Sequence, residues 1–320
     1  MKTLQNLEPL QILGLIGALF FLTAPITIPL VANDFWVSIV AEIMIWGLFA
    51  ASVNLLFGYT GLLSFGQAVY FGMGAYGVAL SIDIFGFSFW PAALVGIAVA
   101  TVTAFITVGW YDVTGGDDGL PFTLPPVFKA GGFEVSLLDL TFQYYFILAV
   151  VAGCFALMHM LLKSPLGFAF IAVRENASRA GLVGYNPYMI RLVSFVFAGF
   201  FAGVSGVLFA LFSRSASAHF LFWTVSGEGV VWMIVGGAGT LFGPVLGAAF
   251  LIIVREELSL YWEHYLLVVG VIVILFVTYA PQGIMGLLKS ALDRIFKRER
   301  EAANSVPTVG EAVAKEGPES

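Results

Sequence analysis

The sequence predicts an all-α, polytopic membrane protein with roughly eight or nine transmembrane or re-entrant helices. Of its 320 residues, 60% are hydrophobic and only 11% are charged, whereas about a quarter of the residues in soluble domains carry a charge. The mean hydropathy is +0.97. Because each membrane helix takes about 20 residues, such helices fill a chain of this length, and no separate soluble domain is expected.

The first half of the chain contains several apolar segments. Residues 10–31 form the first expected span, residues 35–57 the second, and residues 89–108 a later one. The second span carries Glu42 and Asn54. Polar groups in a membrane segment are costly and usually face a bundle interior or a water-filled path. Glu42 lies near the start of its segment and fits an interfacial position equally well.

The segment at residues 58–77 is apolar overall but contains six glycines. Glycine lets helix backbones approach closely, and it also permits irregular backbone where that backbone is buried or lines a cavity. The pattern is therefore consistent with a broken or re-entrant helix and with an ordinary, tightly packed span.

Charge orients the middle of the chain. Residues 112–137 contain four acids and one base among turn-forming glycines and prolines, which predicts an external loop. Residues 138–162 lead back inside, where residues 163–191 carry four bases and one acid and are predicted to form a cytoplasmic loop. Residues 192–212 lead out again, and their Gly199-xxx-Gly203 pattern predicts a close helix contact.

A run of glycines and a proline interrupts the next apolar segment, residues 228–254. This run, residues 235–244, should end a helix. Two short helices that meet at the Gly-Pro turn would let the segment enter and leave on the same face, as the flanking charges require.

The last span is expected at residues 265–280. Five bases and two acids follow at residues 289–300, which places the C-terminus inside. Residues 1–288 are thus interpreted as one transmembrane domain. Residues 289–320 are interpreted as a basic juxtamembrane segment with a disordered cytoplasmic tail.

Several kinds of chemistry are disfavoured by the sequence. His159, His219 and His264 are scattered and do not form a metal motif, and no nucleophile–base motif occurs. The net charge of -6 is dispersed, so nucleic acid is not an expected partner. A phosphate-binding G-x-x-x-x-G-K-[ST] loop is also absent, so any ATP must be bound by another subunit. An enzyme is disfavoured, and no cofactor is expected on this chain.

Five stretches together resemble one known family, the membrane permeases of branched-chain amino acid ABC importers, and within it the LivM-like member of the permease pair. They are residues 54–67 (NLLFGYTGLLSFGQ) with 72–76 (GMGAY), 114–119 (TGGDDG), 164–167 (SPLG), 174–176 (REN) and 236–244 (GGAGTLFGP). They keep the family's order and cover nearly the whole chain.

The resemblance implies an ABC importer permease bundle in a bacterial inner membrane. Its implied partners are a second related permease, two cytoplasmic ATPases that bind ATP, an external substrate-binding protein and the lipid bilayer. It also implies that residues 163–191 dock on an ATPase and transmit its closure to the spans. The residues expected to couple are Arg174, Glu175, Arg179, Ala180 and Gly184. Gly181 stands where family members commonly have an acid.

For the transport path, the expected polar lining is Asn54, Ser64, Gln67 and Tyr76. The positions expected to serve helix packing or bending are Gly61, Gly66, Gly72, Gly74, Gly199, Gly203, Gly239, Gly243 and Pro244. The sequence does not name the substrate; the resemblance implies leucine, isoleucine or valine as the default. Amides, urea and other small solutes use similar permeases.

The chain departs from the family upstream of residues 114–119, where about one ~20-residue span is missing before Trp110. The charge pattern also indicates a missing span. If the N-terminus is internal and all four upstream segments cross the membrane, residues 112–137 would lie inside, whereas their charge predicts an external loop. The alternatives are a missing segment, an external N-terminus, or a third segment that is re-entrant. The competing functions are an ion-coupled secondary transporter of small organic solutes and a structural membrane protein.

Overall fold

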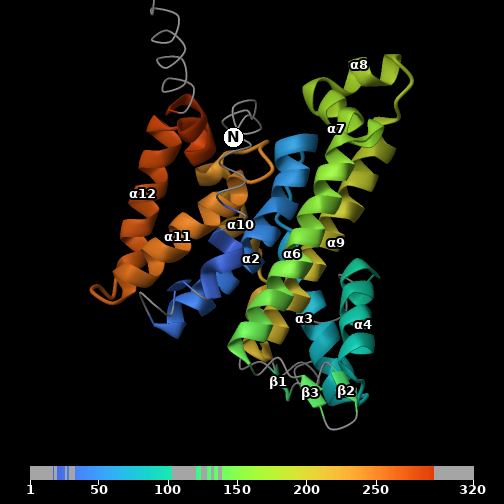
Figure 1. The fold of residues 1–320 in the computed structure, drawn as a ribbon. Coiled ribbons are helices and arrows are strands. Elements are labelled where there is room, and N and C mark those ends of the chain that lie inside the picture. The colour runs from blue at the N-terminus through green and yellow to red at the C-terminus, as the bar shows by residue number, and fades with distance from the viewer. Residues whose placement is uncertain are drawn as a thin grey trace, which may run out of the picture.

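The computed structural model describes residues 17, 20–25, 27–28, 33–102, 120–123, 128–130, 133–135 and 139–291 (Figure 1). The helices are α2 (Asp34–Asn54), the π-helix η1 (Leu55–Thr60), α3 (Gln67–Asp83), α4 (Phe89–Val102), α6 (Leu140–Lys163), α7 (Pro165–Glu175), α8 (Ala177–Leu182), α9 (Pro187–Ser213), the 3-10 helix η4 (Ala218–Leu221), α10 (Trp223–Gly236), α11 (Gly243–Ser259) and α12 (Tyr265–Tyr279). The predicted all-α fold is confirmed.

The only strands in the described residues form two short antiparallel ribbons. β1 (Leu120–Pro121) pairs with β4 (Ser215–Ala216), and β2 (Phe128–Ala130) pairs with β3 (Phe133–Val135). The β1–β4 pair marks one end of the helix bundle, and α7 and α8 lie at the other end (Figure 1). These are called here the β end and the α7–α8 end.

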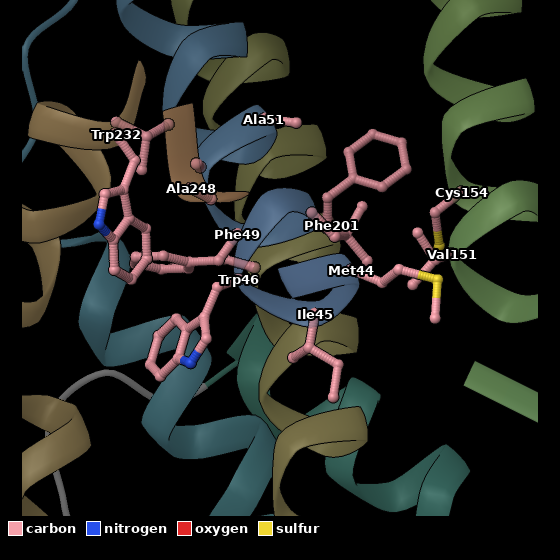
Figure 2. Packing of buried hydrophobic residues seen from close by; sticks show 14 of the residues in the cluster. Met44, Ile45, Trp46, Phe49, Ala51, Val151, Cys154, Phe201, Trp232 and Ala248 are labelled. Atoms are coloured by element: carbon pink, nitrogen blue, oxygen red, sulfur yellow. The ribbon is translucent and has the colours of Figure 1, made fainter. Parts of the chain in front are cut away.

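Helix α2 is the centre of the bundle. It continues through η1 to Thr60, and 94% of the most apolar window of this helix is buried within the chain, against 67% for α9 and 33% for α6. A helix that is apolar all round needs neighbours on every side. Figure 2 shows them: Met44 faces Val151 and Cys154 of α6, while Trp46 and Phe49 pack near Trp232 of α10.

The described residues contain three helices that are long and apolar enough to cross a membrane: Asp34–Thr60, Leu140–Lys163 and Pro187–Ser213. A fourth arises if Tyr265–Tyr279 and Gly283–Ala291, which are bent by 52° relative to each other, form one span. The expected total of eight or nine stays a prediction. Most of residues 10–31, residues 103–119 and residues 292–320 lie outside the described part of the chain.

The glycine-rich third segment is a broken helix. Helix η1 ends at Gly61, whose φ of 74° is left-handed, and α3 begins only at Gln67. Gly61 lies beside Arg174 at the α7–α8 end, whereas Ala79 packs with Phe122 and Ala216 at the β end. The segment therefore leads from one end of the bundle to the other. The helix break at residues 61–66 agrees with the broken-helix alternative. Whether the segment crosses the membrane as a tightly packed span or is re-entrant stays a prediction.

Close packing of α3 on α9 explains several of its glycines. A Cβ on Gly74 would meet the Gly203 carbonyl, and one on Gly206 would meet the Phe71 carbonyl. A Cβ on Gly199 would lie 3.0 Å from the Tyr70 ring. Gly199 and Gly203 both lie where backbones or rings approach closely, which is the kind of contact that the Gly-xxx-Gly pattern predicts.

Two helices meet at the Gly-Pro turn, as the sequence predicts. Helix α10 ends at Gly236, and α11 starts at Gly243 with Pro244 in its first turn, where proline's missing N–H is not needed. Glu228 of α10 and Arg255 of α11 line one groove, so the two helices run antiparallel. Their connecting turn packs against Gln282 and Gly283, which follow α12.

Residues 163–191, predicted to be a loop, are largely helical. Pro165 opens α7, and the Asn176 side chain caps α8 by accepting from the Arg179 N–H. Asn186 caps α9 by accepting from Tyr188 and Met189 N–H groups. The two asparagine caps within this short polar stretch start new helices. The prediction that residues 163–191 form a cytoplasmic connection between two spans stays a prediction.

Candidate functional site

Arg174 joins the predicted coupling segment to the central helix. It lies in the last turn of α7, and its Nη1 donates a hydrogen bond to the carbonyl oxygen of Gly58 in η1. The last carbonyls of a helix lack intrahelical partners, and a cation beside them is favourable. Arg174 therefore satisfies the C-terminal end of the α2–η1 helix instead of pointing away from the bundle.

Asn54 joins the same helix end to the α10–α11 turn. Its Nδ2 donates to the Thr240 carbonyl at 2.8 Å, and its Oδ1 accepts from the Gly239 N–H at 2.8 Å. Its side chain is 1% exposed. Asn54 was expected to line a path, but in this conformation both of its amide atoms hold the turn.

The α10–α11 turn fits closely over η1. A Cβ on Gly58 would lie 2.6 Å from the Gly239 nitrogen, and Gly239 has a left-handed φ of 79°. Thr240 fastens the turn internally, because its Oγ1 donates to the Gly237 carbonyl at 2.7 Å and accepts from the Gly243 N–H at 3.1 Å. Helix α7, the end of the α2–η1 helix and the α10–α11 turn thus meet at one place. This place is here called the junction and consists of Asn54, Gly58, Arg174, Gly239 and Thr240.

The other predicted coupling residues form the exposed tip beyond the junction. Glu175, Arg179 and Gly184 are exposed, and Gly184 has a left-handed φ of 98° in the turn between α8 and α9. Ala180 is buried beneath them. Sequence reasoning missed the apolar part of this tip. Large hydrophobic side chains are exposed there at Leu182, Val183, Tyr185, Tyr188 and Met189.

The remaining predicted path residues are not brought together on one surface. Gln67 and Tyr76 are buried in α3, and the amide of Gln67 has no hydrogen-bond partner among the described residues. Ser64 is half-buried and its Oγ accepts from the Gly66 N–H at 3.2 Å. Beside Ser64, Leu63 and Phe65 are exposed, so the α2–α3 break presents a largely apolar surface.

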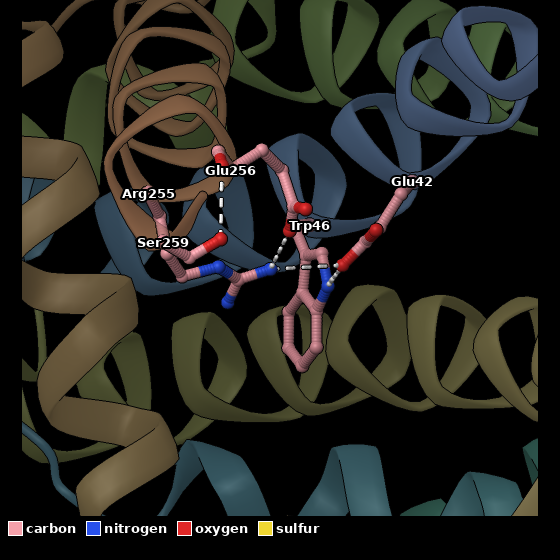
Figure 3. A network of polar contacts seen from close by, with 5 residues as sticks. All are labelled: Glu42, Trp46, Arg255, Glu256 and Ser259. Carbon is pink, nitrogen blue, oxygen red and sulfur yellow. Dashed lines mark hydrogen bonds and ion pairs between the residues drawn. The ribbon is translucent and has the colours of Figure 1, made fainter. Parts of the chain in front are cut away.

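A second polar cluster lies on the side of α2 that faces α11 (Figure 3). Arg255 Nη2 lies 3.4 Å from Glu42 Oε1 and 3.4 Å from Glu256 Oε1. Trp46 Nε1 donates to the same Glu42 oxygen at 3.1 Å. The i,i+4 spacing of Glu42 and Trp46 could have indicated their contact, whereas Arg255 is 213 residues away in the sequence.

Comparison with known proteins gives the following matches. Residues 35–118 and 108–278 match the family described as branched-chain amino acid transport system / permease component. The high-affinity branched-chain amino acid transport system permease protein LivM of Salmonella typhimurium is 25% identical over 302 residues, which cover 80% of this chain and 71% of that protein. The LivM protein of Escherichia coli is 25% identical over 82% of this chain and 73% of its own length.

Permeases for other substrates match shorter parts of the chain. The guanosine ABC transporter permease protein NupQ of Bacillus subtilis is 29% identical over 37% of this chain and 36% of its own length. No solved structure matches the chain.

Proposed function

Because the chain belongs to the family of branched-chain amino acid transport system permease components, we propose that it is the membrane-spanning subunit of an ATP-binding cassette importer. It forms the translocation path for branched-chain or other hydrophobic amino acids in a bacterial inner membrane. Two separate ATPase subunits supply the energy, a second related permease completes the path, and an external binding protein delivers the substrate.

The junction is the observation that carries this proposal. An ATPase that closes against the α7–α8 end would move α7, and Arg174 passes that movement to the Gly58 carbonyl. Asn54 then links the same helix end to the α10–α11 turn. Coupling of this kind needs two packings of the bundle, each favoured by a different partner. The junction ties three segments together, so they would change packing as one unit.

A branched-chain amino acid is favoured over a nucleoside by the extent of the similarity. The two LivM proteins match 80% and 82% of this chain, whereas the guanosine permease matches 37%. Outside any substrate-binding site, a permease that moves an apolar amino acid also needs a path with few strong polar contacts. The apolar surface of Leu63 and Phe65 at the α2–α3 break is suited to such a path.

The test is uptake by a reconstituted complex of this chain with its binding protein, partner permease and ATPases. We expect radiolabelled leucine to accumulate in vesicles only when ATP is supplied, and imposed proton or sodium gradients to have no effect. Uptake driven by an ion gradient without ATP would instead support the secondary-transporter alternative. Robust ATP hydrolysis by the purified chain alone would contradict the proposal.

A further inference from the structure

A groove of about 450 Å³ lies between α10, α11 and α12. Its walls are mostly aliphatic and include Val231, Ile252, Val269 and Ile274, while Glu228 and Arg255 are its charged lining residues. Sites for small molecules commonly have about 300 to 1,000 Å³ and combine apolar walls with a few polar groups. The groove lies away from the junction, and the role proposed above for coupling does not use it.

The charged residues of the groove have hydrogen-bond donors and acceptors that no described residue uses. Arg255 engages Glu42 and Glu256 through Nη2 only, so within the described part of the chain its Nη1 and Nε donors have no partner (Figure 3). Glu228 is exposed to the groove and makes no ion pair or hydrogen bond with any described residue. The groove therefore offers a carboxylate that lies within electrostatic range of Arg255 and His219 but forms no hydrogen bond or ion pair with a described residue, together with guanidinium N–H groups that have no partner there.

We propose that this groove binds a zwitterionic α-amino acid with a branched apolar side chain. The ammonium group binds Glu228, the carboxylate accepts hydrogen bonds from Arg255, and the side chain packs on Val231, Ile252 and Val269. The proposal rests on the proposed transport function and gives that function a specific binding site.

Charge favours this occupant over a membrane lipid. The groove is lined by one acid, Glu228, and one base, Arg255, and Arg255 is already paired with Glu42 and Glu256, which lie outside the lining. A lipid phosphate would therefore meet a guanidinium whose charge is largely compensated and a carboxylate that repels it. A zwitterion carries no net charge and brings its own ammonium to the Glu228 carboxylate, which forms no hydrogen bond or ion pair with a described residue. Both charges of the ligand are then paired as it leaves water, which burial of a charge requires.

The site can be tested by cysteine protection in the full complex in lipid nanodiscs. Ile274→Cys places a thiol on the groove wall, and the single native cysteine, Cys154, is buried on α6. By mass action, L-leucine at a few times its dissociation constant should slow maleimide labelling by a factor of about five. Val277→Cys, on the same helix and outside the groove, should label at an unchanged rate.

Two analogues and a second variant test the recognition itself. 4-Methylpentanoate lacks the ammonium and 3-methylbutylamine lacks the carboxylate, so neither should protect Ile274→Cys. Glu228→Gln should abolish protection by L-leucine, whereas Glu257→Gln, an exposed acid on α11 outside the groove, should preserve it. Protection by the analogues, or protection that survives Glu228→Gln, would overturn the proposal.

The outcomes separate the two proposals. A complex that takes up leucine with ATP but shows no protection of Ile274→Cys refutes the site and leaves the transport function standing. A complex that shows protection but no ATP-driven uptake supports the site and refutes the transport function. A labelling rate that responds to added phosphatidylethanolamine and not to leucine would identify a lipid site and refute the amino acid proposal.

Discussion

At the scale of single residues, Arg174 shows how a charge counted in the sequence can have a structural task. Its positive charge contributed to the prediction of which side is cytoplasmic, but its guanidinium reaches back to the Gly58 carbonyl. We predict that Arg174→Glu lowers leucine uptake per ATP hydrolysed by about tenfold, since loss of a charge-assisted bond of about 1.5–3 kcal/mol disconnects α7 from η1. The measurement is uptake and ATPase activity on the same vesicles.

Arg191→Glu is the matched control for that prediction. Arg191 is an exposed base at the start of α9 with no hydrogen bond or ion pair from its side chain among the described residues. Its reversal should leave the ratio of uptake to hydrolysis unchanged. If Arg174→Glu also leaves the ratio unchanged, the junction does not couple the two activities.

Gln67 gives a prediction about stability. Its buried amide has no partner among the described residues, and an unsatisfied buried polar group costs about 1–3 kcal/mol. Gln67→Met should therefore raise the melting temperature of the detergent-solubilised chain. Because Gln67 is proposed to line the transport path, the same substitution should lower leucine uptake. Normal uptake by this variant would remove Gln67 from the path.

Gln143 is the control for Gln67, because it is also a buried glutamine. Its Nε2 donates to the Leu211 carbonyl at 3.4 Å, so Gln143→Met should lower the melting temperature. A shift in the same direction for both variants would show that the unpaired state of Gln67 has no energetic consequence.

Asn54 illustrates why polar residues in apolar segments are hard to assign from sequence. A buried amide either faces a path or binds another part of the chain, and the two cases look alike locally. The partners of Asn54 are 185 and 186 residues away. Only the folded arrangement shows that it holds the hairpin turn.

At the scale of the elements, the α3–α9 contact depends on glycines that allow backbone approach. We predict that Gly74→Ala destabilises the chain, because the added methyl would collide with the Gly203 carbonyl, and overpacking of this kind costs about 1–3 kcal/mol. Gly153→Ala on α6 is the control, since nothing lies within 4 Å of its added methyl. Expression level and melting temperature measure both.

The bounds of the long helices followed from the sequence, and those of the broken and short ones did not. The apolar runs at residues 138–162 and 265–280 are close to α6 and α12, because a run of that length has no other stable form in a membrane. The π-helix η1 has no local pattern that distinguishes it from α-helix. The helices within residues 163–191 were not predicted, because the composition of a polar, capped helix pair resembles that of an irregular connector.

At the scale of the whole molecule, the segment missing before Trp110 remains a prediction. Ala100 of α4 lies beside Gly203 in the middle of α9, and Leu120 pairs with Ala216 at the β end. Residues 103–119, which lie between them, are outside the described part. The family match is divided into two pieces that share residues 108–118, which supports a departure from the family at this point.

Assembly gives the last prediction. Leu182 and Val183 are 89% and 75% exposed at the tip of α8, beyond the part of the bundle that lipid would cover if the α7–α8 end is cytoplasmic. Large exposed apolar patches mark interaction sites, and the proposed ATPases are the partners expected at this end. Replacing both residues by serine should reduce the ATPase recovered with the tagged chain by about tenfold, as expected when apolar anchors worth about 1–2 kcal/mol are lost from an interface.

The control for this assembly prediction lies at the opposite end of the bundle. Phe85 is 68% exposed in the connection between α3 and α4, so Phe85→Ser removes a comparable apolar side chain where no ATPase is expected. It should leave ATPase recovery unchanged. Equal loss from both variants would indicate general destabilisation, whereas full recovery with the double serine variant would place the ATPase contact elsewhere. Loss confined to Leu182 and Val183 would identify α8 as the contact through which ATPase closure reaches Arg174 and the junction.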